Sequence, residues 1–138
     1  MDRDEIITFI NEHPACHLAT EEGGQPRVRG MQMHRADGRG LVFQTVAGKP
    51  LVEQIRKNPR LEACFNDFAK GVQIRVAGRA EIVEDRKLKE EIIAARGFLK
   101  PLIGEKGEGA IVIFRVTGCR AVVWTSADNA GSGTAIAL

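Results

Sequence analysis

Hydrophobic and polar residues alternate with a period of two along much of the chain, as expected of β-strands with one buried face. The first alternating stretch is ACHLATEE (15–22), and a turn at GGQP separates it from PRVRGMQMHRA (26–36). A second turn at DGRG leads into GLVFQTV (40–46), which predicts a three-stranded antiparallel meander. Further strands are predicted at 61–67, 72–84, 111–118 and 119–126.

Apolar residues three to four positions apart replace this alternation in three places and predict helices there. Asp2 and Glu5 resemble a capping pair at the start of the first helix. Pro50 suits the first turn of the second helix, and Asn58-Pro59 ends it. Residues 98–110 are expected to form a short apolar segment followed by a mobile turn. The helices are predicted at 2–12, 50–58 and 85–96.

About seven strands joined mostly in antiparallel fashion favour a small barrel or sandwich over a parallel α/β fold. A chain of 138 residues is the size of one ordinary domain, and it contains neither an internal repeat nor a domain linker. Residues 1–138 are therefore expected to form one domain. Its Gly-rich end, ADNAGSGTAIAL (127–138), is expected to be a flexible or partner-packing tail.

The charge balance changes the list of possible partners. The formal net charge is +2, with 20 basic and 18 acidic residues intermixed, so neither nucleic acid nor a membrane surface is expected as a partner. No stretch approaches the roughly 18 apolar residues of a membrane span, and we expect a cytoplasmic protein. Cys16, Cys64 and Cys119 form no CxxC pair, and we expect small buried hydrophobes rather than disulfides or a metal site.

The strand at 26–36 carries the first candidate for chemistry. Arg27, Arg29, Met31 and Met33 share one face of an extended strand. That face is either solvated, or it binds a ligand with an anionic end for an arginine and a flat apolar body for a methionine. In the second case Gly30 would let the flat body approach the backbone closely.

A second candidate is QTVAGKP (44–50), where a glycine and Lys49 stand immediately before a helix that begins at Pro50. Free backbone N–H groups, the helix dipole and an ammonium group would together bind an anion. Thr45, at the end of the preceding strand, would add a hydroxyl donor. The same residues also occur at helix starts for purely local reasons.

Isolated polar residues carry less information. Gln73, in VQIRVAGRAE, offers a donor and an acceptor that suit the edge of a heterocyclic ring, although a lone glutamine is more often a surface residue. His13 and His17 in HPACH have a spacing of four, but Pro14 disfavours a helix there, so neither a metal site nor a Cys–His dyad is expected. Trp124 would either cover a bound ring or belong to the core or an interface.

Taken in order, these pieces resemble the pyridoxamine 5'-phosphate oxidase-like family of FMN-binding split β-barrels, in its short, general-stress and uncharacterised branch. The matching text is GQPRVRGMQMH, DGRGLVFQTVAGKPLVEQIRKNPRLEACF and VQIRVAGRAEIVED, within 15–85. The resemblance implies a mainly β (α+β) fold, a six-stranded antiparallel Greek-key split barrel with small peripheral helices. It also implies a homodimer with one FMN in each of two clefts at the subunit interface.

The resemblance assigns the cofactor contacts to four places. These are the strand that carries Arg29, the end of the following strand, the basic residue at the helix start that binds the phosphate, and a glutamine that approaches FMN from the interface. The residues that match are Arg29, Gly30, Met31, Gln44, Thr45, Lys49 and Gln73.

Two positions depart from the family pattern. His34 falls where the oxidase has a lysine, and Pro50 falls where a second basic residue is usual. Phosphate binding is therefore expected to use Lys49 and Arg29, with Arg27 as a further candidate.

The resemblance implies an FMN-binding flavoprotein, and the first hypothesis is a flavin-dependent oxidoreductase that acts on an unknown small substrate. Pyridoxamine phosphate is not the expected substrate, because the sequence VVWTSADNAGSGTAIAL lacks the arginine-containing C-terminal segment of the true oxidase. No catalytic acid or base is identified. The alternatives are a non-enzymatic FMN carrier or redox sensor, and a haem-binding relative with His13, His17 or His34 as axial ligand. The segments FLKPLI and AIAL would pack either on a partner subunit or on the chain's own core.

Overall fold

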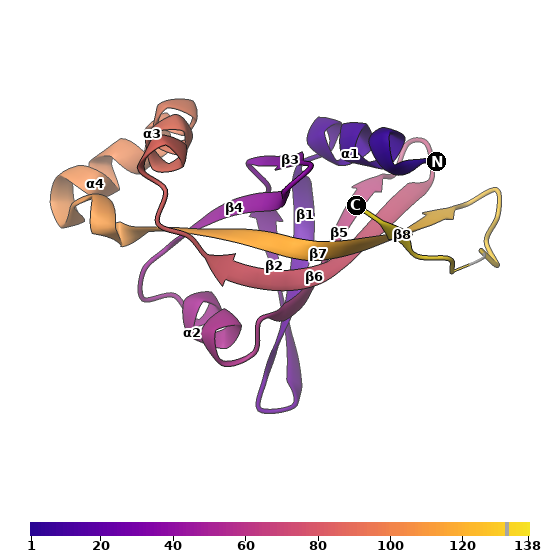
Figure 1. The fold of residues 1–138 in the computed structure, drawn as a ribbon, viewed down its shortest axis with the longest axis horizontal. Helices are drawn as coiled ribbons and strands as arrows, with labels where there is room; N and C mark the ends of the chain where they lie inside the picture. Colours follow the sequence, from indigo (N-terminus) through magenta and orange to yellow (C-terminus); the bar gives the residue numbers. More distant parts are fainter. Residues whose placement is uncertain (132) are drawn as a thin grey trace.

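One antiparallel sheet dominates the computed structural model, which describes residues 1–131 and 133–138 (Figure 1). The described residues form eight strands, so the expected mainly β, α+β class is confirmed. The two shortest strands, β3 and β8, add only 3 and 2 residues to six longer ones. The strands are β1 (Ala15–Glu22), β2 (Gln25–Gln32), β3 (Arg35–Asp37), β4 (Gly40–Val46), β5 (Arg60–Asp67), β6 (Val72–Ile82), β7 (Ile111–Thr125) and β8 (Ile136–Ala137).

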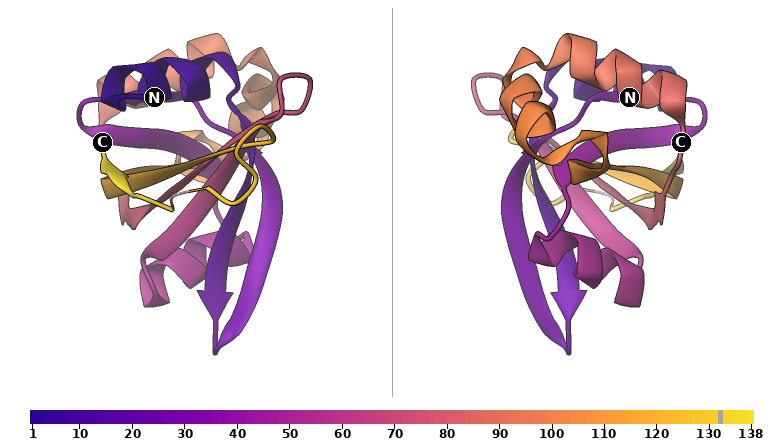
Figure 2. Two further views of the ribbon diagram at one scale, coloured as in Figure 1. Left: turned by 90° about the vertical axis from the view of Figure 1, so that its right-hand side faces the viewer. Right: turned by 90° about the vertical axis from the view of Figure 1, so that its left-hand side faces the viewer.

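The helices lie around this sheet, with α1 and α3 on one side and α2 on the other (Figures 1 and 2). The expected capping pair is present: the Asp2 carboxylate accepts from the Glu5 N–H at 2.9 Å, and Glu5 accepts from the Asp2 N–H at 2.7 Å. No helix in the described part of the chain is long and apolar enough to cross a bilayer. The helices are α1 (Arg3–Glu12), α2 (Pro50–Lys57), α3 (Arg86–Ala95) and α4 (Lys100–Lys106), with short 3-10 turns η1 (Gly97–Leu99) and η2 (Glu108–Ala110).

The sheet is open, and its ends are β2 and β3. The strand order is β2-β1-β5-β6-β7-β4-β3, with β8 beside β7. The chain passes from one end to the other through two residues. The Met33 N–H donates to the Pro14 carbonyl beside β1 at 2.8 Å, and the next N–H, of His34, donates to the Val42 carbonyl of β4 at 2.9 Å. The ends of the sheet therefore meet at one point without pairing along their length, which is the arrangement of a split barrel.

Two predicted strand boundaries differ from the structure. The single strand predicted at 26–36 is divided into β2 and β3, because the backbone changes its partner strand at His34. The two strands predicted at 111–118 and 119–126 form the single strand β7, whose two halves both pair with β6. A register shift opposite Ala77 and Arg79 absorbs Gly118, which has a φ of 62°.

The C-terminal third also contains more regular structure than predicted. The segment expected to be apolar and then mobile forms η1, α4 and η2, and Leu99 at its start is buried. In the tail, β8 pairs with β7, and Ile136 and Leu138 pack against the main core of the same chain. Residue 132 of that tail lies outside the described residues.

Hydrophobic burial holds β4 from both sides. Phe43 faces the main core, where its ring stacks on Phe114 with the centroids 5.3 Å apart. The neighbouring Val42 faces the other way, into a second apolar cluster with Leu88 and Ile92 of α3. Each fully buried side chain of this size contributes about 1.5 to 3 kcal/mol. Strand β4 is therefore a fixed wall against which a site can be built.

Gly40 at the start of β4 provides a test of this arrangement. Its φ is +125°, and an added Cβ would lie 2.0 Å from the Val116 carbonyl oxygen. Gly40→Ala should lower the free energy of unfolding by about 3 kcal/mol or more, because backbone strain and overlap both oppose the new methyl group. Urea denaturation measures the change. Gly109→Ala is the control, since its Cβ would meet nothing within 4 Å; an equal loss in both variants would contradict the described turn.

Candidate functional site

A groove lies where β2 and β4 diverge from the meeting point of the sheet ends. It consists of a cavity of about 300 Å³ and a second of about 280 Å³, which share Gly30, Met31, Thr45 and Lys49. We call these two cavities together the seam groove. The larger cavity adds Gln44 and the smaller adds Arg29, so the structure brings six of the seven predicted cofactor-binding residues to one place. The predicted three-stranded meander is wrong at this point, because it would pair 26–36 with 40–46, whereas β2 and β4 lie near opposite ends of the sheet order and do not pair.

Arg29 and Met31 are half-buried on β2, whereas their neighbours Val28 and Gly30 are exposed. The Arg29 guanidinium donates to the Leu18 carbonyl at 3.2 Å, to the Thr20 hydroxyl at 2.8 Å and to the Gln54 side-chain oxygen at 2.6 Å. Partial burial lowers the pKa of Arg29, and the charge of nearby Glu22 opposes that shift. The alternative of a fully solvated face therefore does not describe Arg29.

Arg27 does not reach the groove. It is exposed and forms an ion pair with Glu22 at 3.3 Å near the end of the β1–β2 hairpin, which projects from the body of the sheet in Figure 2. Arg27 therefore lies apart from Arg29 and Lys49, with which the sequence grouped it. Gly30, by contrast, leaves open space, because a Cβ added there would meet no atom of the chain within 4 Å.

Gln44 and Thr45 form the opposite wall, at the end of β4. Thr45 is buried. Gln44 has a buried side-chain oxygen, Oε1, with no hydrogen-bond partner among the described residues. An unsatisfied buried acceptor costs about 1 to 3 kcal/mol, so such an atom in a cavity wall calls for a donor from outside the chain.

Lys49 stands between β4 and α2. Its backbone is extended, it occupies the N-cap position, and Pro50 begins the helix as expected. In the described part of the chain the Lys49 side chain has no hydrogen-bond or ion-pair partner, and it lines both cavities of the seam groove. An unpaired ammonium and the positive end of a helix dipole therefore meet at one end of the groove.

The seventh predicted residue, Gln73, is elsewhere. It lies on β6, opposite Asn66 of β5 and Trp124 of β7, and it lines neither cavity of the seam groove. The Trp124 indole N–H donates to the Asn129 carbonyl at 3.1 Å. One chain therefore does not place Gln73 with the other six residues.

The sequence did not single out several residues at the groove, and three of these add a charge, an aromatic ring or a buried amide. Arg96 and Phe98 follow α3 and line the larger cavity, and the Arg96 guanidinium donates to the Gln32 carbonyl at 3.1 Å. Burial lowers the pKa of Arg96. Phe98 is 69% exposed at the rim. The third, Gln54 of α2, contacts Arg29. The one sequence feature that could have indicated its role is a polar residue three positions after Leu51 on the apolar face of the helix.

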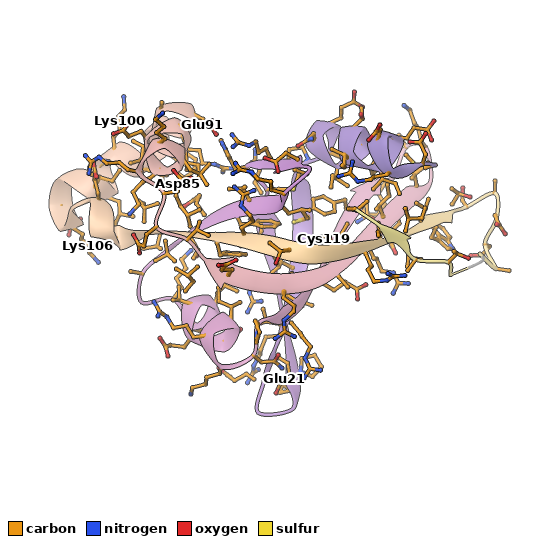
Figure 3. The ribbon with its side chains drawn as sticks, in the orientation of Figure 1. Glu21, Asp85, Glu91, Lys100, Lys106 and Cys119 are labelled. Carbon is orange, nitrogen blue, oxygen red and sulfur yellow. The ribbon has the colours of Figure 1, made fainter. Side chains whose placement is uncertain are left out.

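The histidines lie outside the seam groove. His13 stacks on Phe9, and its Nε2 lies 3.3 Å from the Asp67 carboxylate. His17 is exposed. Glu91 of α3 is labelled in Figure 3. His34 donates from Nε2 to its carboxylate at 2.5 Å, and this bond, together with one from Arg35, lowers the pKa of the Glu91 carboxyl.

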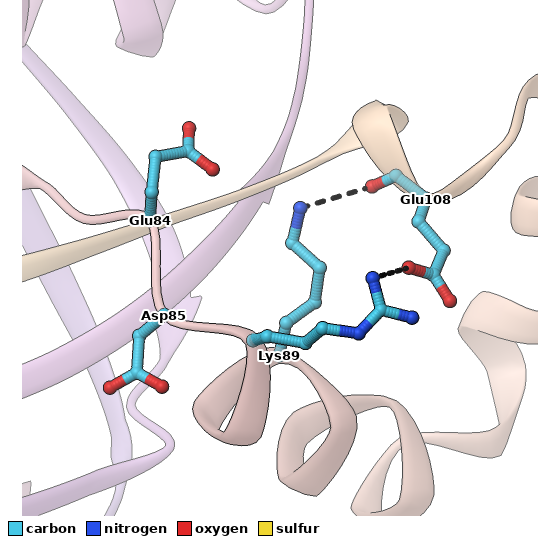
Figure 4. Close-up of a pocket in the computed structure, with 5 residues that line it drawn as sticks. Glu84, Asp85, Lys89 and Glu108 are labelled. Atoms are coloured by element: carbon cyan, nitrogen blue, oxygen red, sulfur yellow. Dashed lines mark hydrogen bonds and ion pairs between the residues drawn. The ribbon is translucent and has the colours of Figure 1, made fainter.

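A separate cavity of about 200 Å³ lies beside the start of α3 (Figure 4). Both of its cations have partners at Glu108: Lys89 donates to the backbone carbonyl at 3.3 Å, and Arg86 lies 3.9 Å from the carboxylate. No group of three or more potential metal ligands occurs among the described residues. This cavity therefore offers no unpaired cation comparable to Lys49.

Comparison with known proteins identifies the family. Residues 3–122 match the family model described as pyridoxamine 5'-phosphate oxidase. The chain is 33% identical over 86 residues to a pyridoxine/pyridoxamine 5'-phosphate oxidase of Agrobacterium fabrum, which covers 62% of this chain and 42% of that protein. A protein of the same description from Escherichia fergusonii is 36% identical over 61 residues, covering 44% and 28%. The chain belongs to the pyridoxamine 5'-phosphate oxidase family, and its match spans less than half the length of either relative.

Solved structures share the fold. A NimC/NimA family protein from Clostridium acetobutylicum superposes with a TM-score of 0.79 at 24% identity, over 98% of this chain and 92% of that one. General Stress Protein 26 from Bacillus anthracis gives 0.77 at 20% identity over 100% of both chains. A FAD-binding protein from Mesorhizobium loti gives 0.61 at 21% identity, over 85% and 89%. These likenesses establish the split-barrel fold.

The thiols are the remaining candidate nucleophiles, and the structure separates them. Burial, reinforced by neighbouring Cys64, raises the pKa of the Cys16 thiol to about 12, and burial also raises the pKa of Cys119. Cys64 is half-buried. At pH 8 iodoacetamide should therefore label Cys64 first, because the thiolate is the reactive form. Mass spectrometry of the native protein measures the order, and Cys64→Ser should abolish the fast phase. Equal labelling of Cys16 would contradict the described burial.

Proposed function

We propose that this chain is an FMN-binding flavoprotein whose cofactor occupies the seam groove. The observation that carries the proposal is the gathering of Arg29, Lys49 and the Gln44 acceptor around one groove at the open seam of the sheet. Membership of the family supports a flavin ligand, and one protein of the same fold is described as FAD-binding.

The smaller cavity fits the phosphate end of FMN. It contains two cations, Arg29 and Lys49, and it lies at the N-terminal end of α2. A phosphate bound there would receive charge-assisted hydrogen bonds and would face the positive end of the helix dipole. The same arrangement supports FMN over an unphosphorylated flavin.

The larger cavity fits the ring system. Gln44 Oε1 would accept a hydrogen bond from a ring N–H, which satisfies the one buried side-chain acceptor that lacks a partner among the described residues. Met31 offers a polarizable apolar surface beside it, and Gly30 leaves the adjoining space free of side-chain atoms.

The proposal includes a homodimer. The family resemblance assigns Gln73 to the cofactor, yet Gln73 lies on β6 away from the seam groove of its own chain. A second copy that presents its β6 to the groove would complete the predicted set of seven. The proposal also includes a cytoplasmic location, where thiols such as the three free cysteines persist in reduced form.

Bound flavin would supply hydride or electron transfer, which makes a flavin-dependent oxidoreductase with an unknown small substrate the first reaction class. The chain's own contribution is orientation and positive charge. Among the described residues that line the seam groove there is no aspartate, glutamate, histidine or cysteine to act as general acid or base. A second candidate, a non-enzymatic FMN carrier or redox sensor, needs no such group. Turnover of NAD(P)H with an electron acceptor separates this candidate from the oxidoreductase.

The first experiment is a visible absorption spectrum of the purified protein, followed by calorimetric titration with FMN. Flavin bands near roughly 450 nm, or uptake of one FMN per chain, support the proposal. A colourless protein that takes up no FMN at about 1 mM would overturn it.

Lys49→Ala tests the phosphate end. The variant should weaken FMN binding about 10- to 100-fold, because a charge-assisted contact of about 1.5 to 3 kcal/mol is lost. Arg29→Ala should have an effect of similar size. Lys57→Ala, an exposed lysine at the other end of α2, is the matched control and should bind FMN like the parent protein. Unchanged affinity in both Lys49→Ala and Arg29→Ala would place the phosphate elsewhere.

A further inference from the structure

Arg29 is held in a closed triangle of hydrogen bonds beneath the seam groove. Its Nη1 donates to Thr20 Oγ1 at 2.8 Å, and its Nη2 donates to Gln54 Oε1 at 2.6 Å. The Thr20 hydroxyl in turn donates to Gln54 Oε1 at 2.6 Å. Thr20 and Gln54 are each only 4% exposed. The guanidinium is therefore fixed from β1 on one side and from α2 on the other.

The orientation of the Gln54 amide follows from the chemistry of its partners. Its Nε2 donates to Glu22 Oε2 at 3.2 Å, and its Oε1 accepts from Arg29. A carboxylate can only accept and a guanidinium can only donate, so a flipped amide would oppose donor to donor and acceptor to acceptor. Gln54 consequently presents an acceptor to Arg29 in the only arrangement that satisfies all of these bonds.

Two of the five N–H groups of Arg29 have no partner among the residues that the structure describes. Nη1 uses both of its hydrogens, on Leu18 O and Thr20 Oγ1, and Nη2 uses one, on Gln54. Because the Thr20 and Gln54 oxygens are bonded to each other, they occupy the Nη1–Nη2 edge. The Nε–H and the second Nη2–H remain, and together they form the edge that binds an oxyanion in bidentate fashion.

The partners of Arg29 are also neutral. Among the described residues Arg29 forms no ion pair, and Glu22 of the neighbouring strand contacts Gln54 and Arg27 instead. A carboxylate in the place of Gln54 would hold the same geometry but would cancel the charge. The amide fixes Arg29 and leaves its positive charge available to an anion.

We infer that Gln54 and Thr20 are positioning residues that hold Arg29 with its free edge toward the smaller cavity, and so give the site its preference for a phosphorylated flavin. The inference rests on the proposed function, since it takes the phosphate of FMN as the ligand of that edge. It extends the site to a helix, α2, that supplies Lys49 directly and fixes Arg29 through Gln54.

The test compares affinities for FMN and riboflavin, which differ in the phosphate alone. Gln54→Met keeps the buried volume but removes the acceptor. It should weaken FMN binding about tenfold, since loss of a fixed charged contact costs about that factor, and leave riboflavin binding unchanged. In an Arg29→Ala background the same substitution should have no further effect on FMN affinity. Gln25→Met is the matched control, because Gln25 is exposed and, within the described part of the chain, its amide donates to the Pro26 carbonyl alone.

The other outcomes decide between the claims. Equal weakening of FMN and riboflavin binding in Gln54→Met would show a purely structural role. That result, or no change in either affinity, would leave the FMN-to-riboflavin affinity ratio unchanged and overturn the inference. Parent protein that binds both flavins equally would overturn it as well and leave flavin binding intact. Parent protein that binds neither flavin would overturn the proposed function, and the inference with it. If Gln54→Met does not fold, Thr20→Val decides by the same ratio, with an expected loss of about threefold in FMN affinity.

Discussion

Two consecutive backbone hydrogen bonds, from Met33 to Pro14 and from His34 to Val42, join the opposite ends of the sheet. Strands β2 and β3 remain the two edges of the sheet, and these bonds hold the edges together at one point. Because the ends meet at only one point, the residues before Met33 diverge from the last residues of β4, and the seam groove opens between them. The site is therefore a direct result of a barrel that starts to close and does not finish.

Burial then fixes the walls of that opening. Strand β4 is held on one face by the main core and on the other by the cluster beneath α3, so Gln44 and Thr45 project from a rigid element. The facing wall, β2, has no such double cover, and its register depends on β1 and on the polar contacts of Arg29. Rigid apolar packing on one side and directional hydrogen bonds on the other give the groove its shape.

The period-two pattern predicted the long strands well, because most of them have one buried and one exposed face. It failed at residues 111–126, where Gly118 looked like the end of a strand. Pairing of both halves with β6 overrides that local signal, and the glycine absorbs the extra residue. The helix α4 was missed because GEKGEG is rich in glycine, although Gly107 serves only as the cap that ends it.

The residues of the site likewise divide into those that the sequence predicted and those that only the tertiary structure reveals. The ordered resemblance grouped Arg29, Gly30, Met31, Gln44, Thr45 and Lys49, and the structure brings these six together. Arg96 and Phe98 depend on how the chain reverses after α3, which no local period records. Gln54 is polar on an apolar helix face, but its partner comes from a different strand, so only the tertiary structure explains why it is buried. Gln73 lies apart from these six residues within one chain, and its place at the site belongs to the proposed homodimer.

Helix α2 has a consequence for anyone who would redesign this protein. Lys49 stands at its N-cap, and Arg29 of β2 is tied to its second turn through Gln54, so the helix links the two cations of the groove. The helical rise sets the spacing along α2 between the backbone of Lys49 and that of Gln54, the residue that holds Arg29. Swapping α2 with its preceding loop would therefore exchange one cation and the anchor of the other, whereas lengthening the loop by a single residue would displace Lys49 and draw Gln54 away from Arg29 at once.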